Sequence, residues 1–226
     1  MSISIISVNW NGYDFQSLMI DSILKHSKEE HPILIFNNNL DRSNDERIRE
    51  WSVCGKNMGH GYGINFLLQE VQTKYVLLLD IDCHLLTNWE EEFLKYKDFI
   101  VAPAGPPQKP LRVACLFAET DKIRHYDFMS TPGYKGHRVT PDGFDVGIAA
   151  YHQMAKDGLE FKWMDTTPGR YGPERSEEYG LDKKPLVYHY WHGTHLNESD
   201  RQKDFEHDLV NEKEIFFNVY AKEVAN

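Results

Sequence analysis

The stretch LLLDIDCHLL, residues 77–86, brings two carboxylates, Asp80 and Asp82, to the end of an aliphatic run. Together with the preceding Tyr75 and Val76, this run has the composition of a buried strand. Residues two apart in an extended chain face the same way, so we expect both acids to point to one site. Hard cations such as Mg²⁺ and Mn²⁺ prefer oxygen ligands and complete their coordination with phosphate and water. The stretch therefore predicts a strand ending in a metal-diphosphate site or, as the simpler alternative, two solvated acids at a strand end.

The residues around this stretch predict a regular alternation of strands and helices. We expect strands at 3–10, 32–36 and 75–82, and helices at 15–27, 45–51 and 64–71. This alternation implies right-handed crossovers and a mostly parallel central sheet flanked by helices, an α/β fold. Ligands of such sheets bind at the carboxyl ends of the strands, where the polar runs NWNG, NNNLD and DIDC occur here.

The second half of the chain is less regular. We expect strands at 99–105, 111–119, 161–167 and 185–191, and helices at 144–158 and from about residue 204 onward. The segment 168–184 reads as a long loop, either a lid whose Arg170, Arg175 and Lys183 touch a diphosphate or an ordinary solvated loop. A chain of 226 residues can bury one large core, so we expect a single domain over 1–226.

Composition narrows the function classes. The formal net charge of -10 argues against binding to a nucleic-acid backbone, which relies on clustered Lys and Arg. An acidic protein that binds a diphosphate needs local positive charge, which a divalent cation can supply. The chain shows no apolar run long enough for a transmembrane segment and no signal-like start, so we expect a soluble, cytoplasmic protein. Cys54, Cys83 and Cys115 lack metal-ligand spacing, and we expect reduced thiols.

A glycine-rich motif precedes the acids. NMGHGYGIN, residues 57–65, fits N-x-G-x-x-x-G-x-N and leads into a helix, and glycines there let a backbone approach a ligand closely. This motif, followed by a helix and an aliphatic strand ending in D-x-D, resembles family 2 and related glycosyltransferases of the GT-A fold, a Rossmann-like nucleotide-diphospho-sugar transferase fold. SVNWNG, residues 7–12, is similar to their first strand and donor loop. The resemblance covers roughly the first hundred residues well and the rest more loosely.

The resemblance implies a nucleoside-diphosphate sugar donor, a glycan or other hydroxyl acceptor, and a bound Mn²⁺ or Mg²⁺. Asp80 would lie near the ribose and the metal, and Asp82 would be the direct metal ligand. The remaining residues that the resemblance assigns to the donor are Val8, Asn9, Asn11, Asn38, Asn57, Gly59 and Asn65. The identity of the donor's nucleobase stays open, because the family usually has an acid directly after the second strand, whereas the first acid here is Asp41. The domain would divide into a nucleotide-sugar half (1–100), an acceptor half (101–200) and a closing helix (201–226).

Two later motifs complete the expected site. An inverting transferase needs a general base, and FDVGIAAYHQMAKDG is similar in position to the family's base helix, with Asp145 as its acid. Asp145 is equally suited to cap that helix. HYWHG, residues 189–193, resembles the late motif that supplies a histidine to the metal, and imidazole suits Mn²⁺ better than Mg²⁺. Alternation places His189 and His192 on opposite faces, so we expect only one of them to reach the ion.

Other functions fit the sequence less well. A haloacid-dehalogenase-type phosphatase also ends a strand in D-x-D, but normally does so in its first strand. A sugar-nucleotide pyrophosphorylase would carry a basic glycine-rich loop where this chain has SVNWNGYD. A non-catalytic module that binds a nucleotide or glycan stays open, because the base helix keeps only one acid of the family's usual pair.

Overall fold

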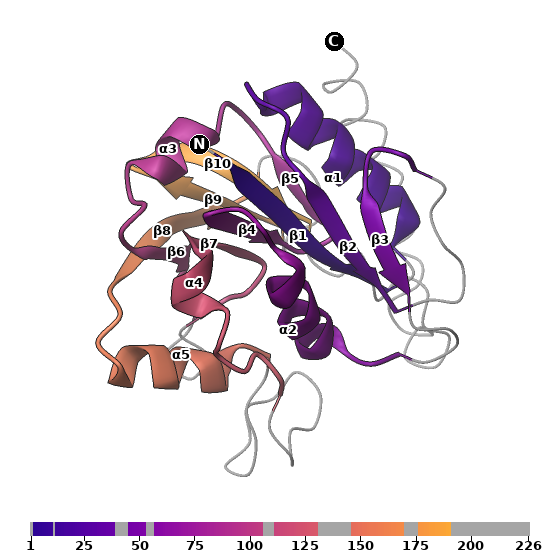
Figure 1. Cartoon of the computed structure of the whole chain (residues 1–226). Helices are drawn as coiled ribbons and strands as arrows, with labels where there is room; N and C mark the ends of the chain where they lie inside the picture. The colour runs from indigo at the N-terminus through magenta and orange to yellow at the C-terminus, as the bar shows by residue number, and fades with distance from the viewer. Residues whose placement is uncertain are drawn as a thin grey trace, which may run out of the picture.

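The structure is a computed structural model that describes residues 2–10, 12–38, 45–52, 57–105, 111–130, 146–169 and 176–190. These residues form a 10-stranded sheet with the order β3-β2-β1-β4-β7-β6-β8-β9-β10-β5, with helices on both faces (Figure 1). The strands are β1 (Ile3–Asn9), β2 (Ile33–Asn37), β3 (Arg49–Ser52), β4 (Tyr75–Leu79), β5 (Cys83–Leu85), β6 (Ile100–Pro103), β7 (Cys115–Glu119), β8 (Phe161–Pro168), β9 (Glu177–Leu181) and β10 (Lys184–His189). The helices are α1 (Tyr13–His26), α2 (His60–Glu70), α3 (Glu90–Leu94), α4 (Thr120–Ile123) and α5 (Ile148–Lys156).

The first half of the chain has the expected parallel arrangement. β3, β2, β1 and β4 are neighbours in that order, and each adjacent pair is parallel. The register aligns Asn9 of β1 with Asn37 of β2, and Ile6 of β1 with Leu78 of β4. The carboxyl ends of β1, β2 and β4 therefore lie at the same edge of the sheet, as the sequence predicted.

The prediction of a mostly parallel sheet is not confirmed, because the sheet as a whole is mixed. β6 pairs parallel with β8, but the pairs β4–β7, β7–β6, β8–β9, β9–β10 and β10–β5 are antiparallel. The physical reason is clearest between β9 and β10, which are joined by only Asp182 and Lys183, both with positive φ (50° and 67°). A two-residue connection of this kind reverses the chain and allows only an antiparallel pair.

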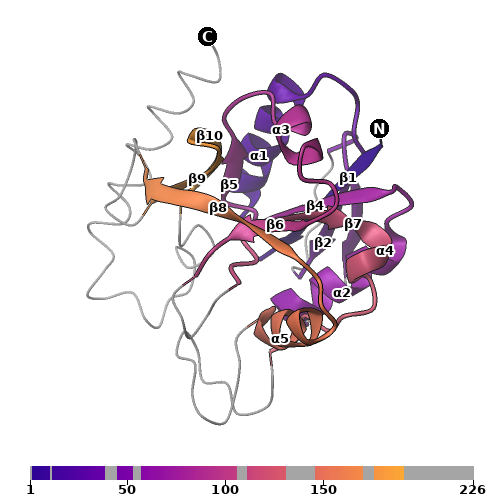
Figure 2. The ribbon, with the colours of Figure 1, turned by 90° about the vertical axis from the view of Figure 1, so that its left-hand side faces the viewer.

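Two hydrophobic clusters lie on opposite faces of the sheet, because successive strand residues point to opposite sides. Ile3 and Ile5 of β1 face a cluster that includes residues of α1 and α3, whereas Ile6 and Val8 face a cluster with residues of α2 and α5. Figure 2 shows α1 and α3 above the sheet and α2 and α5 below it. This double cover excludes water from the central strands.

Three local expectations were wrong. The stretch 45–51 was expected to be helical, but Arg49–Ser52 forms β3, which pairs parallel with β2 and packs Trp51 edge-on against Phe66. Part of the expected loop 168–184 is the strand β9. The expected strand 75–82 stops at Leu79 and resumes as β5 after a turn. In each region, pairing with a neighbouring strand of the sheet outweighs the local pattern. The expected closing helix lies outside the described residues, and the single-domain division stays a prediction.

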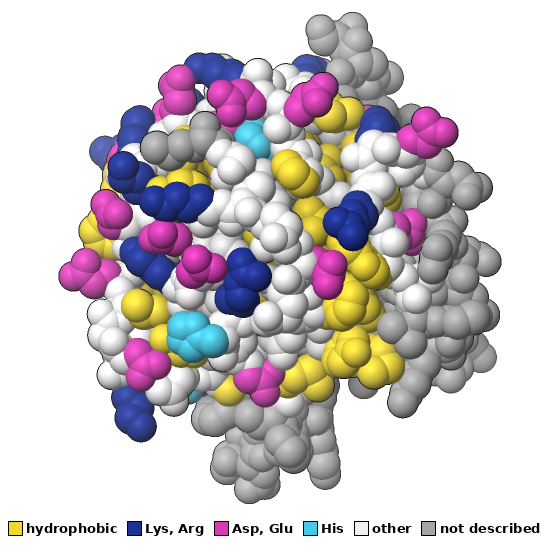
Figure 3. All heavy atoms as spheres, in the orientation of Figure 1, with side chains coloured by type: hydrophobic (Ala, Val, Ile, Leu, Met, Phe, Trp, Pro, Cys, Tyr) yellow, Lys and Arg dark blue, Asp and Glu magenta, His cyan; other side chains and the backbone are white. Residues whose placement is uncertain are grey.

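The described surface mixes charges of both signs. Figure 3 shows basic and acidic side chains interspersed over the described part of one face. Exposed ion pairs such as Arg47–Asp21, at 2.7 Å, are worth little stability individually. None of the helices within the described ranges has the length and apolar character needed to cross a membrane.

Candidate metal and donor site

The two acids of the D-x-D motif lie in a turn, not in an extended strand. The Cys83 N–H donates to the Asp80 carbonyl at 2.9 Å, which closes the turn between β4 and β5. The turn gives the acids different surroundings. The Asp80 side chain is 24% exposed and lies 3.2 Å from His60 Nε2, whereas the Asp82 side chain is 8% exposed and lies beside His189.

Asp82 and His189 are brought together by the pairing of β5 with β10. His189 is the register partner of Cys83, and the Tyr190 N–H donates to the Asp82 carbonyl at 3.0 Å. His189 Nε2 lies 3.4 Å from Asp82 Oδ1, and both side chains are buried. Adjacent ligands of an octahedral ion, each about 2.1 Å from it, lie about 3 Å apart. The pair therefore has a spacing suited to two ligands of one cation.

The charges around His189 favour its protonation. Burial by itself would lower the pKa of His189, but the carboxylates of Asp82, Asp80 and Glu177 and the hydrogen bond with Asp82 raise the pKa overall. The imidazolium offsets the negative charge of Asp82 in the buried pair. A divalent cation at this position would take over that role, and its binding would release the proton.

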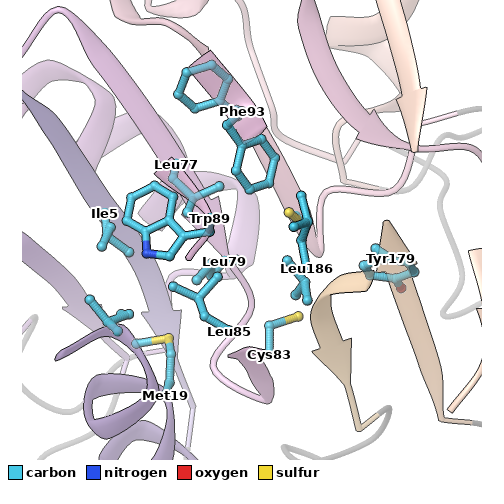
Figure 4. Packing of buried hydrophobic residues seen from close by; sticks show 14 of the residues in the cluster. Ile5, Met19, Leu77, Leu79, Cys83, Leu85, Trp89, Phe93, Tyr179 and Leu186 are labelled. Atoms are coloured by element: carbon cyan, nitrogen blue, oxygen red, sulfur yellow. The ribbon is translucent and has the colours of Figure 1, made fainter. Parts of the chain in front are cut away.

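Cys83 is the third potential ligand, since Asp82, Cys83 and His189 offer donor atoms within 4.8 Å of one another. Its chemistry does not suit a hard cation. Burial raises the pKa of the Cys83 thiol well above its ordinary value, and its Sγ donates to the Ala114 carbonyl at 3.3 Å. Figure 4 shows the side chain among hydrophobic residues such as Leu85 and Leu186. The remaining carboxylate and imidazole fit Mn²⁺ rather than a thiolate-bound zinc.

The neighbouring His84 is a core residue. It is fully buried, stacks on Phe15 with ring centroids 6.5 Å apart, and burial lowers its pKa to about 3. A neutral imidazole at this position contributes packing instead of charge.

Asparagines at the strand ends shape the loops around the acids. Asn9 Oδ1 accepts the Gly12 N–H, and Asn9 Nδ2 donates to Gln16 Oε1, both at 2.8 Å. Asn38 Oδ1 accepts the Met58 N–H at 2.9 Å. Since these amides are already hydrogen-bonded to the protein, their roles toward a nucleoside stay predictions. Val8, near the end of β1 at the same edge of the sheet, is buried, with 7% of its surface exposed.

The glycine-rich motif serves packing as well as conformation. Asn57 Oδ1 accepts the Gly59 N–H at 2.8 Å, and Gly59 has a φ of +89°, which a residue with a side chain rarely adopts. A Cβ on Gly61 would lie 2.5 Å from the Phe128 carbonyl oxygen, and one on Gly63 would lie 2.7 Å from a Val8 methyl. The glycines therefore let α2 pack closely against β1 and residue 128.

Asn65 ties α2 to the segment before α5. Its Nδ2 donates to Asp127 Oδ1 at 2.7 Å, and its Oδ1 accepts the Phe128 N–H at 2.9 Å. The predicted role of Asn65 at the donor stays a prediction. An asparagine suits this position because its amide can donate one hydrogen bond and accept another.

His60 was missed by sequence reasoning, although it lies within the quoted motif. His60 is the first residue of α2, and its side chain contacts Asp80, so the start of α2 lies next to the first acid of the D-x-D motif. Asn11, Asp145 and His192, by contrast, lie outside the described residues, as do Arg170 and Arg175.

Comparison with known proteins gives structural likeness only. No family model matches the chain, and no curated protein matches it in sequence. TarS of S. aureus is similar with a TM-score of 0.45 and 14% identity over 58% of this chain and 30% of that one. Mannosyltransferase PcManGT from Pyrobaculum calidifontis, solved with GDP-Man and Mn²⁺, gives 0.48 and 10% over 71% and 54%. The apo glycosyltransferase GlyE of Streptococcus pneumoniae TIGR4 gives 0.48 and 11% over 72% and 45%. The chain thus spans about a third to a half of the length of these proteins.

Proposed function

We propose that this chain is a metal-dependent glycosyltransferase that moves a sugar from a nucleoside-diphosphate sugar to a hydroxyl of a glycan or other acceptor. The observation that carries the proposal is the contact between Asp82 and His189. The two residues are far apart in the sequence, yet Asp82 Oδ1 and His189 Nε2 lie 3.4 Å apart beside the carboxyl ends of the parallel strands. Such strand ends are where α/β sheets bind ligands.

Asp82 and His189 would hold the cation, Mn²⁺ or Mg²⁺. When bound, the cation supplies the positive charge that a diphosphate leaving group requires. Asp80 is more exposed than Asp82 and lies toward the start of α2, so it would be available to the ribose or as a further ligand of the cation. The N–H groups at the start of α2 favour a negatively charged ligand in the same place.

The chain's own residues would then orient the donor and activate the acceptor. In an inverting reaction, the base removes the proton of the acceptor hydroxyl as its oxygen attacks the anomeric carbon from the face opposite the diphosphate. We assign this role to Asp145. The described chain resumes at Val146, and the Gly147 N–H donates to the Phe128 carbonyl at 3.0 Å, which ties the start of α5 to the segment that Asn65 holds.

The test is release of nucleoside diphosphate from a panel that includes UDP-GlcNAc and GDP-Man, with Mn²⁺, Mg²⁺ or chelator. We expect turnover that depends on the cation and that falls at least 100-fold in Asp82→Asn, because the amide removes the ligand's charge without changing its size. Asp121→Asn is the matched control, since the Asp121 side chain is 90% exposed on α4. Binding of a nucleotide sugar without release would identify a non-catalytic module, and cation-independent turnover in Asp82→Asn would refute the proposal.

A further inference from the structure

A row of polar side chains extends behind His189, on the side away from Asp82. Tyr179 is fully buried, and its hydroxyl lies 2.6 Å from His189 Nδ1 and 3.2 Å from Glu177 Oε2. Arg112 Nη1 in turn donates to Glu177 Oε2 in a close ion pair. The row therefore runs from Arg112 through Glu177 and Tyr179 to His189, and joins the segment before β7 to β9 and β10.

The donors and acceptors of this row fix the direction of its hydrogen bonds. An ionised carboxylate such as Glu177, paired with Arg112, can only accept, so the hydroxyl proton of Tyr179 must point to it. A phenol has a single proton, so toward His189 the Tyr179 oxygen acts as the acceptor. The proton between Tyr179 and His189 then belongs to Nδ1, and Nε2 is left to face Asp82.

This arrangement has a chemical consequence for a metal ligand. A neutral imidazole that carries its proton on Nδ1 presents the lone pair of Nε2, and the partner of Nδ1 sets both the tautomer and the ring orientation. The opposite direction, in which Tyr179 donates to Nδ1, would place the lone pairs of Tyr179 against Glu177 at 3.2 Å. That direction is disfavoured, because a carboxylate in an ion pair with Arg112 accepts hydrogen bonds and does not donate them.

We propose that Tyr179, held by Glu177 and Arg112, is a positioning residue that presents Nε2 of His189 to a divalent cation shared with Asp82. The proposal rests on the proposed function, since it requires that Asp82 and His189 bind a cation. It adds three residues to that site that neither the acidic motif nor the late histidine motif contains.

The test compares Mn²⁺ affinity of the full chain, measured by the electron paramagnetic resonance signal of free Mn²⁺. Tyr179→Phe removes the hydroxyl and keeps the buried ring, so we expect Mn²⁺ to bind about 10- to 100-fold more weakly. Tyr126→Phe is the matched control, because Tyr126 is also a buried tyrosine and its hydroxyl donates to a carboxylate, Asp157 Oδ2, at 2.9 Å on the opposite face. We expect its Mn²⁺ affinity to equal that of the wild type.

A spectroscopic measurement separates positioning from simple structural support. Ring ¹⁵N shifts of the protein loaded with diamagnetic Mg²⁺, assigned with His189→Gln, should report a proton on Nδ1 and the cation at Nε2 in the wild type, and a different pattern in Tyr179→Phe. The expected pattern is a changed tautomer and weaker Mn²⁺ binding in Tyr179→Phe only. If Mn²⁺ binds the wild type, weakens in Asp82→Asn and is unaffected in Tyr179→Phe, the positioning role is wrong and the metal site stands. If the wild type binds no Mn²⁺, or Asp82→Asn binds it equally well, both proposals fail.

Discussion

Two groups of strands border the candidate metal site, and they differ in composition and in pairing. One group is the parallel strands β2, β1 and β4, and the other is the antiparallel strands β9, β10 and β5. The first group is made of strands rich in aliphatic residues, and every residue of β1, β2 and β4 is buried. The second group is short or mixed in composition and depends on pairing between distant segments, such as His189 with Cys83. The first region supplies a rigid edge with polar strand ends, and the second adds the imidazole. The candidate metal pair exists only where the two regions meet.

The largest effect is expected at α2, which packs against the parallel strands β1 and β2. In Gly61→Ala, the new Cβ would lie 2.5 Å from the Phe128 carbonyl oxygen and 2.7 Å from Met129 Cα, both backbone atoms that cannot rotate away. We expect a loss of about 1–3 kcal/mol in the free energy of unfolding, measured by urea denaturation. Gly59→Ala meets no atom within 4 Å and adds only the strain of a positive φ, so it should cost less, about 1 kcal/mol. Equal losses would contradict a close contact at Gly61.

The next effect concerns α3, which follows β5 and is tied to the end of α1. Glu90 is buried and accepts the Lys28 N–H at 2.9 Å and a hydrogen bond from His31 Nε2 at 2.8 Å. Burial would raise the pKa of Glu90, but these hydrogen bonds outweigh it and lower the pKa overall. A lowered pKa means that the folded state favours the carboxylate. The stabilisation is thus complete above the unfolded pKa, near 4.5, and is lost as the pH falls through the lower folded value.

Glu90→Gln should therefore be less stable than the wild type by about 1–2 kcal/mol at pH 7, and the difference should shrink below pH 4. Urea unfolding at several pH values measures this difference. The neighbouring Glu91→Gln is the control, because the Glu91 side chain is 69% exposed and its solvent-screened ion pair with Lys28 should contribute much less. A pH-independent difference for Glu90→Gln would contradict the account of this contact.

The smallest effect lies in the antiparallel region, at the turn between β9 and β10. Lys183 has a φ of 67°, a conformation that glycine adopts without steric cost. Lys183→Gly should stabilise the hairpin by up to about 1 kcal/mol, seen as a higher midpoint of thermal unfolding. Lys156→Gly, in the last turn of α5, should have the opposite sign, because glycine is unfavourable in a helix. Destabilisation in both variants would contradict the role of the turn.

The sequence predicts the parallel region better than the antiparallel one, for a physical reason. The strands β1, β2 and β4 are encoded locally by apolar runs, whereas β3 is a polar edge strand and β9 is flanked by loop-like residues, so both were missed. The direction of pairing in the second half depends on short connections such as Asp182 and Lys183, which no hydrophobic pattern encodes. Asp82 and His189 were singled out by residue type and resemblance, and the structure brings them together. Tyr179 and His60 were missed because their roles come from spatial neighbours.

The central claim is that Asp82 and His189 bind one divalent cation, and anomalous diffraction from a crystal soaked with Mn²⁺ and UDP tests it most directly. The account predicts a single strong manganese peak about 2.1–2.3 Å from both Asp82 Oδ1 and His189 Nε2, with its open side toward the diphosphate. A peak bound by Asp80 without His189, or no peak near the carboxyl ends of β1 and β4, would contradict the account.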